Sequence, residues 1–287
     1  MSAAEATMDT VAHDAMEGGR PRRQLLRSEL RLMARRRRNL VGLATLCLIP
    51  VLIAIVLAVV RPTQGESFFS VLLGNGLFVV LATLAIEMTM MLPLAVSILS
   101  GDSIAGEANI GTLRYLLTTP VGRTRLLVVK FASLVIGAIV GVLAVSLVAA
   151  VLGLALFGAG DFVTVSGVPI GFGDAAVRIG LVAVYVALCL VPVCAIGLFA
   201  STMTEQPIGA AIATAMFGII SQILGNISAL DWLHPFLLTN YWPAWTDLLR
   251  VPMAFDSLGK GLISMACYTA IFGTAAWARF TTRDITS

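Results

Sequence analysis

Long apolar stretches alternate with short polar or glycine-rich breaks along most of this 287-residue chain. A helix needs about 20 apolar residues to cross about 30 Å of hydrocarbon. Six stretches are long enough, at residues 39–60, 76–99, 126–157, 176–201, 208–229 and 258–278. The third is longer than a straight crossing requires, so we expect it to tilt or to extend past the membrane. The pattern predicts an all-α polytopic membrane protein whose six transmembrane helices form one domain, residues 39–278.

The residues before the first apolar stretch divide into two parts. Residues 1–21 are mostly small and polar, which predicts a disordered tail. Residues 22–38 place Leu26, Leu30 and Met33 at helical spacing, which predicts an amphipathic helix on the membrane surface. The arginines expected to face anionic head groups are Arg22, Arg23, Arg27, Arg31, Arg35, Arg36, Arg37 and Arg38. A basic cluster that only sets membrane orientation would give the same pattern, and both interpretations can hold together.

Basic residues are unevenly distributed between the two sides that six spans would create. With a cytoplasmic N-terminus, nine lie before the first span, four at 114–130 and two after the last, which makes fifteen inside. The four outside are Arg61, Arg178, Arg250 and Lys260. Cytoplasmic loops carry an excess of Lys and Arg, so we expect both termini, including the tail 279–287, to be cytoplasmic. No small-x-small cleavage site follows the first span, so we expect no cleaved signal peptide.

Composition agrees with a lipid environment. The mean hydropathy is +0.94, and 12% of residues are charged, about half the share typical of soluble domains. The cysteines all lie in apolar segments without a CxxC pair, at Cys47, Cys189, Cys194 and Cys267. A zinc site or a disulfide framework needs thiols that converge in polar surroundings. We therefore expect these cysteines to be small packing residues and expect no metal site.

The last external segment, residues 230–257, is too long for a turn and too polar to span a membrane. It contains Trp232, Tyr241, Trp242 and Trp245. Aromatic rings favour the membrane interface, and irregular backbone at that depth must be buried in protein. The segment therefore predicts re-entrant or interfacial helices between the fifth and sixth spans.

Residues 100–125 form the largest internal cytoplasmic loop in this topology. Its sequence "EANIGTLRYLLT" predicts a short helix with apolar and charged faces, ended by Pro120. Such a helix, held under the membrane by two spans, is suited to docking into a groove on a partner. Arg123, Arg125 and Lys130 follow and can hold the next span at the head groups. The loop contains no nucleophile–base pair or metal-ligand spacing, and the chain contains no GxxxxGK[ST] motif.

This loop resembles the one that follows the second span in ABC-2 type permeases, the membrane subunits of ATP-driven exporters. The resemblance is carried by Asp102, Glu107, Gly111-Thr112-Leu113, Leu116-Leu117, Pro120, Arg123, Leu126 and Lys130, in that order and spacing. The nearest subgroup contains antibiotic-resistance, sodium-export and nitrous-oxide-reductase-maturation permeases. The plan of six spans, a basic N-terminal helix and a long last external loop is also similar to that family.

The resemblance implies a coupling helix that seats in a separate ABC ATPase subunit, present in two copies. Closure of the two ATPases would rock this chain and a second permease chain, identical or homologous, between inward- and outward-facing states. Asp102 and Glu107 would contact the ATPase or the interfacial helix. The other coupling residues would be Gly111, which permits a close approach, then Thr112, Leu113, Arg114, Leu116 and Leu117 in the docking helix, and Pro120 at its end.

On this interpretation the chain has no catalytic site and binds no cofactor, because ATP and Mg²⁺ belong to the ATPase subunit. Its partners are the ATPase, the second permease chain and the lipid bilayer, and no nucleic acid. The family favours a multi-pass protein of the bacterial plasma membrane that exports its substrate. The motif does not identify that substrate.

Glu87 lies close to the middle of the second predicted span. A charge at the bilayer centre costs about 2.5–3.5 kcal/mol on insertion scales, so such a residue usually faces a cavity or a partner. Glu87 either lines a translocation route or relays protons, or it only fixes helix packing, with Thr83, Thr89, Gln222 or Asn226 as partners. Pro93 lies six residues on and can kink the span.

Other polar and small residues within the spans have two interpretations each. Gln222 and Asn226 lie four apart on the fifth span, and they either line the translocation route or only bond neighbouring helices. Gly137 and Gly141 form a GxxxG step in the third span, which indicates close helix packing rather than dimerisation.

Three function classes fit a multi-pass protein of this size. The first is the permease subunit of an ABC exporter. The alternative is a proton-coupled secondary transporter that uses Glu87, although we see no internal repeat of the kind that such transporters usually show. A membrane enzyme is the third, and the sequence offers no metal site, dyad or triad for it.

Overall fold

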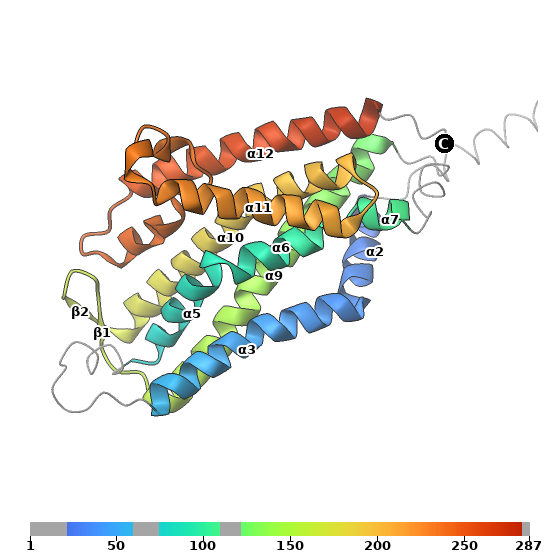
Figure 1. The fold of residues 1–287 in the computed structure, drawn as a ribbon. Helices are drawn as coiled ribbons and strands as arrows, with labels where there is room; N and C mark the ends of the chain where they lie inside the picture. The colour runs from blue at the N-terminus through green and yellow to red at the C-terminus, as the bar shows by residue number, and fades with distance from the viewer. Residues whose placement is uncertain (1–21, 60–74, 110–121, 283–287) are drawn as a thin grey trace, which may run out of the picture.

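A computed structural model describes residues 22–59, 75–109 and 122–282 (Figure 1), and 82% of the described residues are helical. The helices are α2 (Arg22–Arg35), α3 (Arg37–Val59), α5 (Leu77–Thr89), α6 (Met91–Gly101), α7 (Ala105–Asn109), α9 (Arg123–Phe157), α10 (Phe172–Met203), α11 (Pro207–Gly225) and α12 (Asp256–Thr282). The remaining elements are the strands β1 (Phe162–Val163) and β2 (Pro169–Ile170) and the 3₁₀ helices η1 (Ser228–Leu230), η2 (His234–Phe236) and η3 (Trp242–Leu249).

Five helices are long and apolar enough to cross a membrane: α3, α9, α10, α11 and α12. The pair α5 and α6 meets the same criteria together, although the two helices are bent by 53° at Met90. The chain is therefore a helical protein with several potential membrane spans. Their ends agree with the predicted ones to within four residues, because long apolar runs mark helices directly.

The second predicted span differs from the continuous helix expected at 76–99. It breaks at Met90, where α5 ends and α6 begins. Pro93 lacks the amide N–H that would bond to Thr89 four residues earlier, and its ring crowds that carbonyl. The side chain of Gln222 on α11 donates to this Thr89 oxygen instead, with 2.5 Å between Gln222 Nε2 and Thr89 O. The bend is thus stabilised from a neighbouring helix.

Helix α10 forms the centre of the bundle. In the most apolar 18-residue stretch of α10, 72% of the residues are buried, whereas the corresponding share is 17% in each of α3, α11 and α12. It packs against α12, α6, α9 and α11, while α3 lies at one edge against α9 and α5 (Figure 1). The outer helices therefore present large apolar side chains outwards, as expected for helices that face lipid or another chain.

Backbones approach closely where small residues meet. A Cβ atom on Gly76 would lie 2.2 Å from the Gly153 backbone, and one on Gly101 would lie 2.7 Å from the amide of Ala211. Only glycine fits at these contacts, which bring α5 against α9 and α6 against α11.

The two ends of the bundle differ in character (Figure 1). One end carries α2 and α7, with the start of α9 and the end of α12, and we call it the basic end. At this end Arg123 donates to the Thr281 carbonyl at 3.0 Å, and Trp277 Nε1 donates to Thr124 at 3.0 Å. The other end carries β1, β2 and the 3₁₀ helices, and we call it the loop end.

The loop end departs in one respect from the all-α expectation, because β1 and β2 pair as a small antiparallel hairpin. The segment expected to hold short helices contains η1, η2 and η3. Arg178 on α10 donates to the carbonyls of Leu248 and Arg250 at 3.0 and 2.7 Å, and Tyr185 donates to the Tyr241 carbonyl at 2.8 Å. These bonds attach the 3₁₀ segment to the central helix.

Candidate functional site: the charged clusters at the basic end

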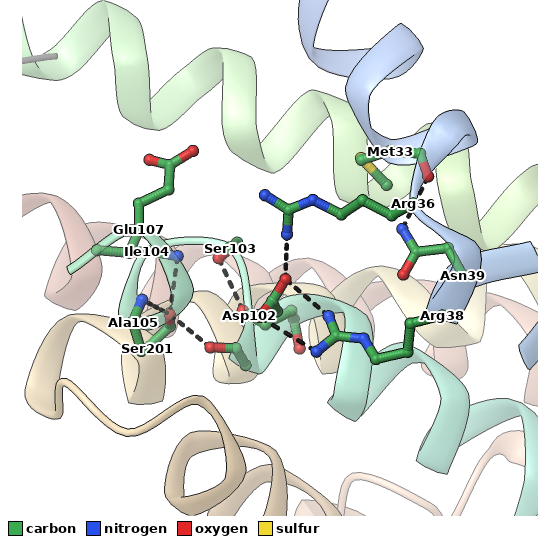
Figure 2. Close-up of polar contacts among 12 residues, drawn as sticks. Met33, Arg36, Arg38, Asn39, Asp102, Ser103, Ile104, Ala105, Glu107 and Ser201 are labelled. Atoms are coloured by element: carbon green, nitrogen blue, oxygen red, sulfur yellow. Dashed lines mark hydrogen bonds and ion pairs between the residues drawn. The ribbon is translucent and has the colours of Figure 1, made fainter. Parts of the chain in front are cut away.

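Asp102 follows α6 and forms ion pairs with two arginines at the junction between α2 and α3 (Figure 2). Arg36 lies at that junction and bonds to Asp102, and Arg38 Nη2 lies 2.7 Å from Asp102 Oδ2. The Asp102 side chain is largely buried, whereas both arginines are exposed. Two guanidinium groups thus share one carboxylate and fix the α2–α3 junction against the end of α6.

Lys130 on α9 forms a second cluster. Its Nζ lies 2.9 Å from Glu29 Oε1 on α2 and 2.7 Å from Glu107 Oε1 on α7. Lys130 is only 1% exposed. A buried charge is tolerated when it is paired and hydrogen-bonded, and the two carboxylates meet that requirement. Lys130 therefore links three segments that are distant in sequence.

This burial corrects the sequence-based expectation for Lys130. A lysine at the start of a span was expected to reach the lipid head groups, but the side chain points into protein. The reason is that α2 packs over the start of α9. This packing places Glu29 of α2 beside Lys130.

Ser201, near the end of α10, holds the start of α7 (Figure 2). Its Oγ accepts from the amides of Ile104 and Ala105 at 3.0 and 2.8 Å, and donates to the Gly101 carbonyl at 3.0 Å. The first amides of a helix have no partner within it, so a serine from another helix satisfies them here. The turn between α6 and α7 is thereby attached to the central helix.

The structure brings together two of the predicted coupling residues, Asp102 and Glu107, on the same short segment. Asp102 contacts Arg36 and Arg38 in the segment predicted as the interfacial helix, one of its two predicted partners. Glu107 instead contacts Lys130 on α9. The other predicted coupling residues lie outside the described residues: Gly111, Thr112, Leu113, Arg114, Leu116, Leu117 and Pro120.

The basic helix at 22–38 is divided at Arg36 into α2 and the first turn of α3. Its predicted apolar line, Leu26, Leu30 and Met33, is half-buried, because α2 packs on α9. The described basic side chains Arg27, Arg31, Arg35, Arg36, Arg37 and Arg38 are exposed, and the side chains of Arg22 and Arg23 lie outside the described residues. The helix is amphipathic as predicted, but its apolar face meets protein.

Glu87 on α5 is 0% exposed. Among the described residues, neither of its carboxylate oxygens has a hydrogen-bond partner. The partners expected from the sequence bond elsewhere: Thr83 to the Val79 carbonyl at 2.7 Å, and Gln222 to Thr89. Asn226 donates to the carbonyl of Gln222, one turn earlier on its own helix, at 2.8 Å. Gln222 thus bonds two helices together, whereas Glu87 is buried without a hydrogen-bond partner among the described residues.

The four cysteines are free thiols, and Cys189 and Cys194 are buried in α10. Within the described ranges 22–59, 75–109 and 122–282, no group of three or more His, Cys, Asp or Glu side chains could hold a metal ion.

Residues 49–286 match the model of a family described as protein of unknown function DUF2705. The chain belongs to the DUF2705 family. No curated protein matches the chain. The DUF2705 match contains Glu87, Asp102, Glu107 and Lys130, but it begins after α2 and therefore excludes Glu29, Arg36 and Arg38.

Two residues of this DUF2705 chain were not singled out by sequence reasoning. Glu29 occurs among many arginines, and no spacing shows that it faces Lys130. Ser201 ends an apolar helix in an ordinary context, and only the three-dimensional position of α7 gives it a role. A lysine four residues after the start of the predicted span 126–157 was the one available signal of a buried ion pair.

Proposed function

We propose that this protein is the permease subunit of an ATP-driven exporter. The observation that supports the proposal is the attachment of residues 102–107 to the bundle, because this segment leads directly into the predicted coupling helix. Asp102 is bonded to the α2–α3 junction, Glu107 to α9, and the amides of Ile104 and Ala105 to α10. Displacement of the coupling helix would therefore be passed to four helices at once.

Coupling over such a distance requires a rigid connection to an element with two arrangements. The Lys130 cluster supplies the main connection, since a buried ion pair with good geometry resists separation more than a contact exposed to water. Two copies of a separate ATPase subunit, carrying ATP and Mg²⁺, would drive this chain and a second permease chain. On this proposal α3, the bent pair α5–α6, α9, α10, α11 and α12 are six spans, with both termini in the cytoplasm of a bacterial plasma membrane.

The first experiment is purification of the tagged full chain from its native host in mild detergent. Co-purifying chains are identified and ATP hydrolysis is assayed. We expect an ATPase-sized partner, retained by the wild type and lost when Leu116 in the predicted docking helix is changed, Leu116→Asp. Glu107→Lys would be a poorer test, because it places a second cation beside Lys130 and disturbs the bundle itself.

Leu32→Asp is the matched control. Leu32 is an exposed apolar residue on α2 at the same end of the bundle, outside the predicted coupling helix. It should retain the partner. A chain that purifies alone and transports in vesicles on a proton gradient, without ATP, would contradict the proposal.

A second candidate function is proton-coupled transport, and the bent pair α5–α6 favours it. Secondary transporters place their sites at discontinuous helices near the middle of the membrane. Here Glu87 is in the last turn of α5, three residues before the break at Met90, and it is buried without a partner among the described residues.

The variant Glu87→Gln separates the two candidates. A proton relay predicts loss of transport, or loss of its pH dependence, while the protein remains folded. An ATP-driven exporter without a relay predicts transport and pH dependence close to those of the wild type.

A further inference from the structure

An apolar groove of about 630 Å³ lies between α2, α3, α6 and α9, beside the charged clusters. This volume falls within the range of about 300–1,000 Å³ that is usual for ligand pockets. Leu46, Met91 and Gly141 line its inner part, and Met33 and Arg38 line the part nearest the basic end. The groove has an apolar interior and a charged entrance.

The groove opens to the outside of the bundle rather than to a central channel. Several of its wall residues are exposed apolar side chains: Leu40 on α3, Met91 and Ile98 on α6, and Val140 on α9. In a membrane, these side chains border hydrocarbon. The groove is therefore accessible from the lipid.

Its length corresponds to one leaflet. The α3 wall runs from Arg38 to Leu46, about 12 Å at 1.5 Å per residue. Half of a hydrocarbon core of about 30 Å is about 15 Å. The groove thus extends from the membrane surface towards the centre without crossing it.

Gly141 leaves space within the groove. A Cβ atom on Gly141 would meet nothing within 4 Å, whereas one on Gly137 would lie 2.9 Å from the Leu99 side chain and 3.0 Å from that of Met33. The GxxxG step was expected to mark close helix packing. Gly137 fits that expectation, but Gly141 borders an open hollow instead.

The entrance has an excess of positive charge. Two arginines, Arg36 and Arg38, share the single carboxylate of Asp102, which leaves one positive charge uncompensated there. The other polar wall groups are satisfied within the protein, since Asn39 donates to the Met33 carbonyl and Thr45 to that of Val41, both at 2.9 Å. The groove therefore presents a cation at the surface and only satisfied or apolar groups below it.

We propose that this groove binds one anionic phospholipid from the leaflet on the α2 side, with its phosphate at Arg38 and an acyl chain along α3, α6 and α9. The proposal requires only that the bundle lies in a membrane, and it does not depend on the exporter function. A positive charge near the surface attracts anionic lipid, and each buried methylene strengthens binding about fourfold.

Native mass spectrometry tests the proposal. The full chain in detergent is incubated with phosphatidylglycerol or with phosphatidylcholine of the same acyl chains. We expect the wild type to retain phosphatidylglycerol in preference. Filling the groove by Gly141→Leu should reduce retention of phosphatidylglycerol about tenfold or more, because the new side chain occupies the space of several methylenes. Arg38→Gln should reduce the preference for phosphatidylglycerol about fivefold.

Each variant has a matched control. Gly180→Leu adds the same side chain at an exposed glycine of α10, where a Cβ also meets nothing within 4 Å. Arg37→Gln removes the adjacent charge, which does not line the groove. Both should bind phosphatidylglycerol as the wild type does. Gly42→Leu fills the groove from the α3 wall, with open space at its Cβ, and replaces Gly141→Leu if that variant fails to fold.

Three results would overturn the proposal. The first is equal retention of the two lipids by the wild type. The second is unchanged retention of phosphatidylglycerol in the folded groove-filling variants. The third is a change of Gly141→Leu from dimer to monomer with lipid binding intact, which would show that the groove receives a second copy of the chain.

Discussion

Lys130 and Glu87 are both buried ionisable residues, but only Lys130 has partners for its charged group among the described residues. Lys130 lies at the basic end, with carboxylate oxygens from two other helices at 2.7 and 2.9 Å. Glu87 lies in α5, and no described residue bonds to its carboxyl group. An isolated ion in an apolar medium is strongly unfavourable, whereas a paired and hydrogen-bonded ion is tolerated.

The difference indicates what each residue can do. The charge of Lys130 is paired within the chain itself, so a single folded subunit is enough for its role. The carboxyl group of Glu87 has no hydrogen-bond partner among the described residues. A substrate, a second chain or a bound proton would have to pair with it or neutralise it. Stability measurements on matched variants separate these two roles, and the following predictions run from the largest expected change to the smallest.

Replacement of Lys130 should have the largest effect. The variant Lys130→Met keeps the length of the side chain but leaves Glu29 and Glu107 close together without their cation. We expect a loss of about 3–5 kcal/mol, the usual effect of removing one partner from a buried ion pair. Thermal unfolding in lipid nanodiscs, followed by intrinsic fluorescence, measures it.

Lys260→Met is the control for this prediction. Lys260 Nζ lies 2.7 Å from Asp256 Oδ2 at the loop end, where both side chains are exposed. Its loss should change the unfolding temperature little, because exposed pairs contribute little. Restoring neutrality with Glu29→Gln and Glu107→Gln should recover part of the stability of Lys130→Met. Equal melting of Lys130→Met and Lys260→Met would show that the buried cluster is not what holds α2 and α7.

Replacement of Glu87 should raise the free energy of unfolding, whereas replacement of Lys130 should lower it. The variant Glu87→Met removes a buried polar group that has no hydrogen-bond partner among the described residues. We expect the protein to become more stable by about 1–3 kcal/mol, while any activity that needs the carboxyl group is lost. The same unfolding assay measures the gain.

Gln222→Met is the informative comparison, because it deletes the donor to the Thr89 carbonyl that Pro93 leaves free. It should lower stability while Glu87→Met raises it. A destabilised Glu87→Met protein would mean that Glu87 has a stabilising partner in the assembled protein.

Sequence alone predicted the helices well and the clusters poorly, for a physical reason. The apolar runs of α3, α9, α10, α11 and α12 are local signals, so their ends were found to within four residues. The break at Met90 could be predicted only in part. Pro93 indicated a kink, but the donor to the Thr89 carbonyl is Gln222 on α11, 133 residues away.

The candidate site depends on contacts between distant residues. Lys130 and Glu29 are 101 residues apart, and Ser201 is 97 residues from Ile104. No periodicity encodes such pairs, and an arginine-rich helix with a single glutamate looks like a membrane-surface helix. The family resemblance therefore pointed to Asp102 and Glu107 and to the helix that Asp102 contacts, but not to the pairing of Lys130 with Glu29 and Glu107.

The smallest effect is expected at Asp102, which sharpens the comparison because the cations that pair with it are exposed. Like Glu107, Asp102 bonds to cations from another segment, but its partners Arg36 and Arg38 are 42% and 51% exposed, against 2% for the Lys130 side chain. Water and salt screen such a pair, and its contribution falls to about 0.2–1 kcal/mol. The variant Asp102→Asn keeps the shape and one acceptor oxygen, so we expect a loss of stability within that range that shrinks further at high salt.

The loss of stability for Lys130→Met should change little with salt, because that ion is shielded from solvent. Equal salt dependence of the two variants would show that the two clusters are equally exposed to solvent, and would remove the physical basis for treating Lys130 as the main attachment of α2 and α7.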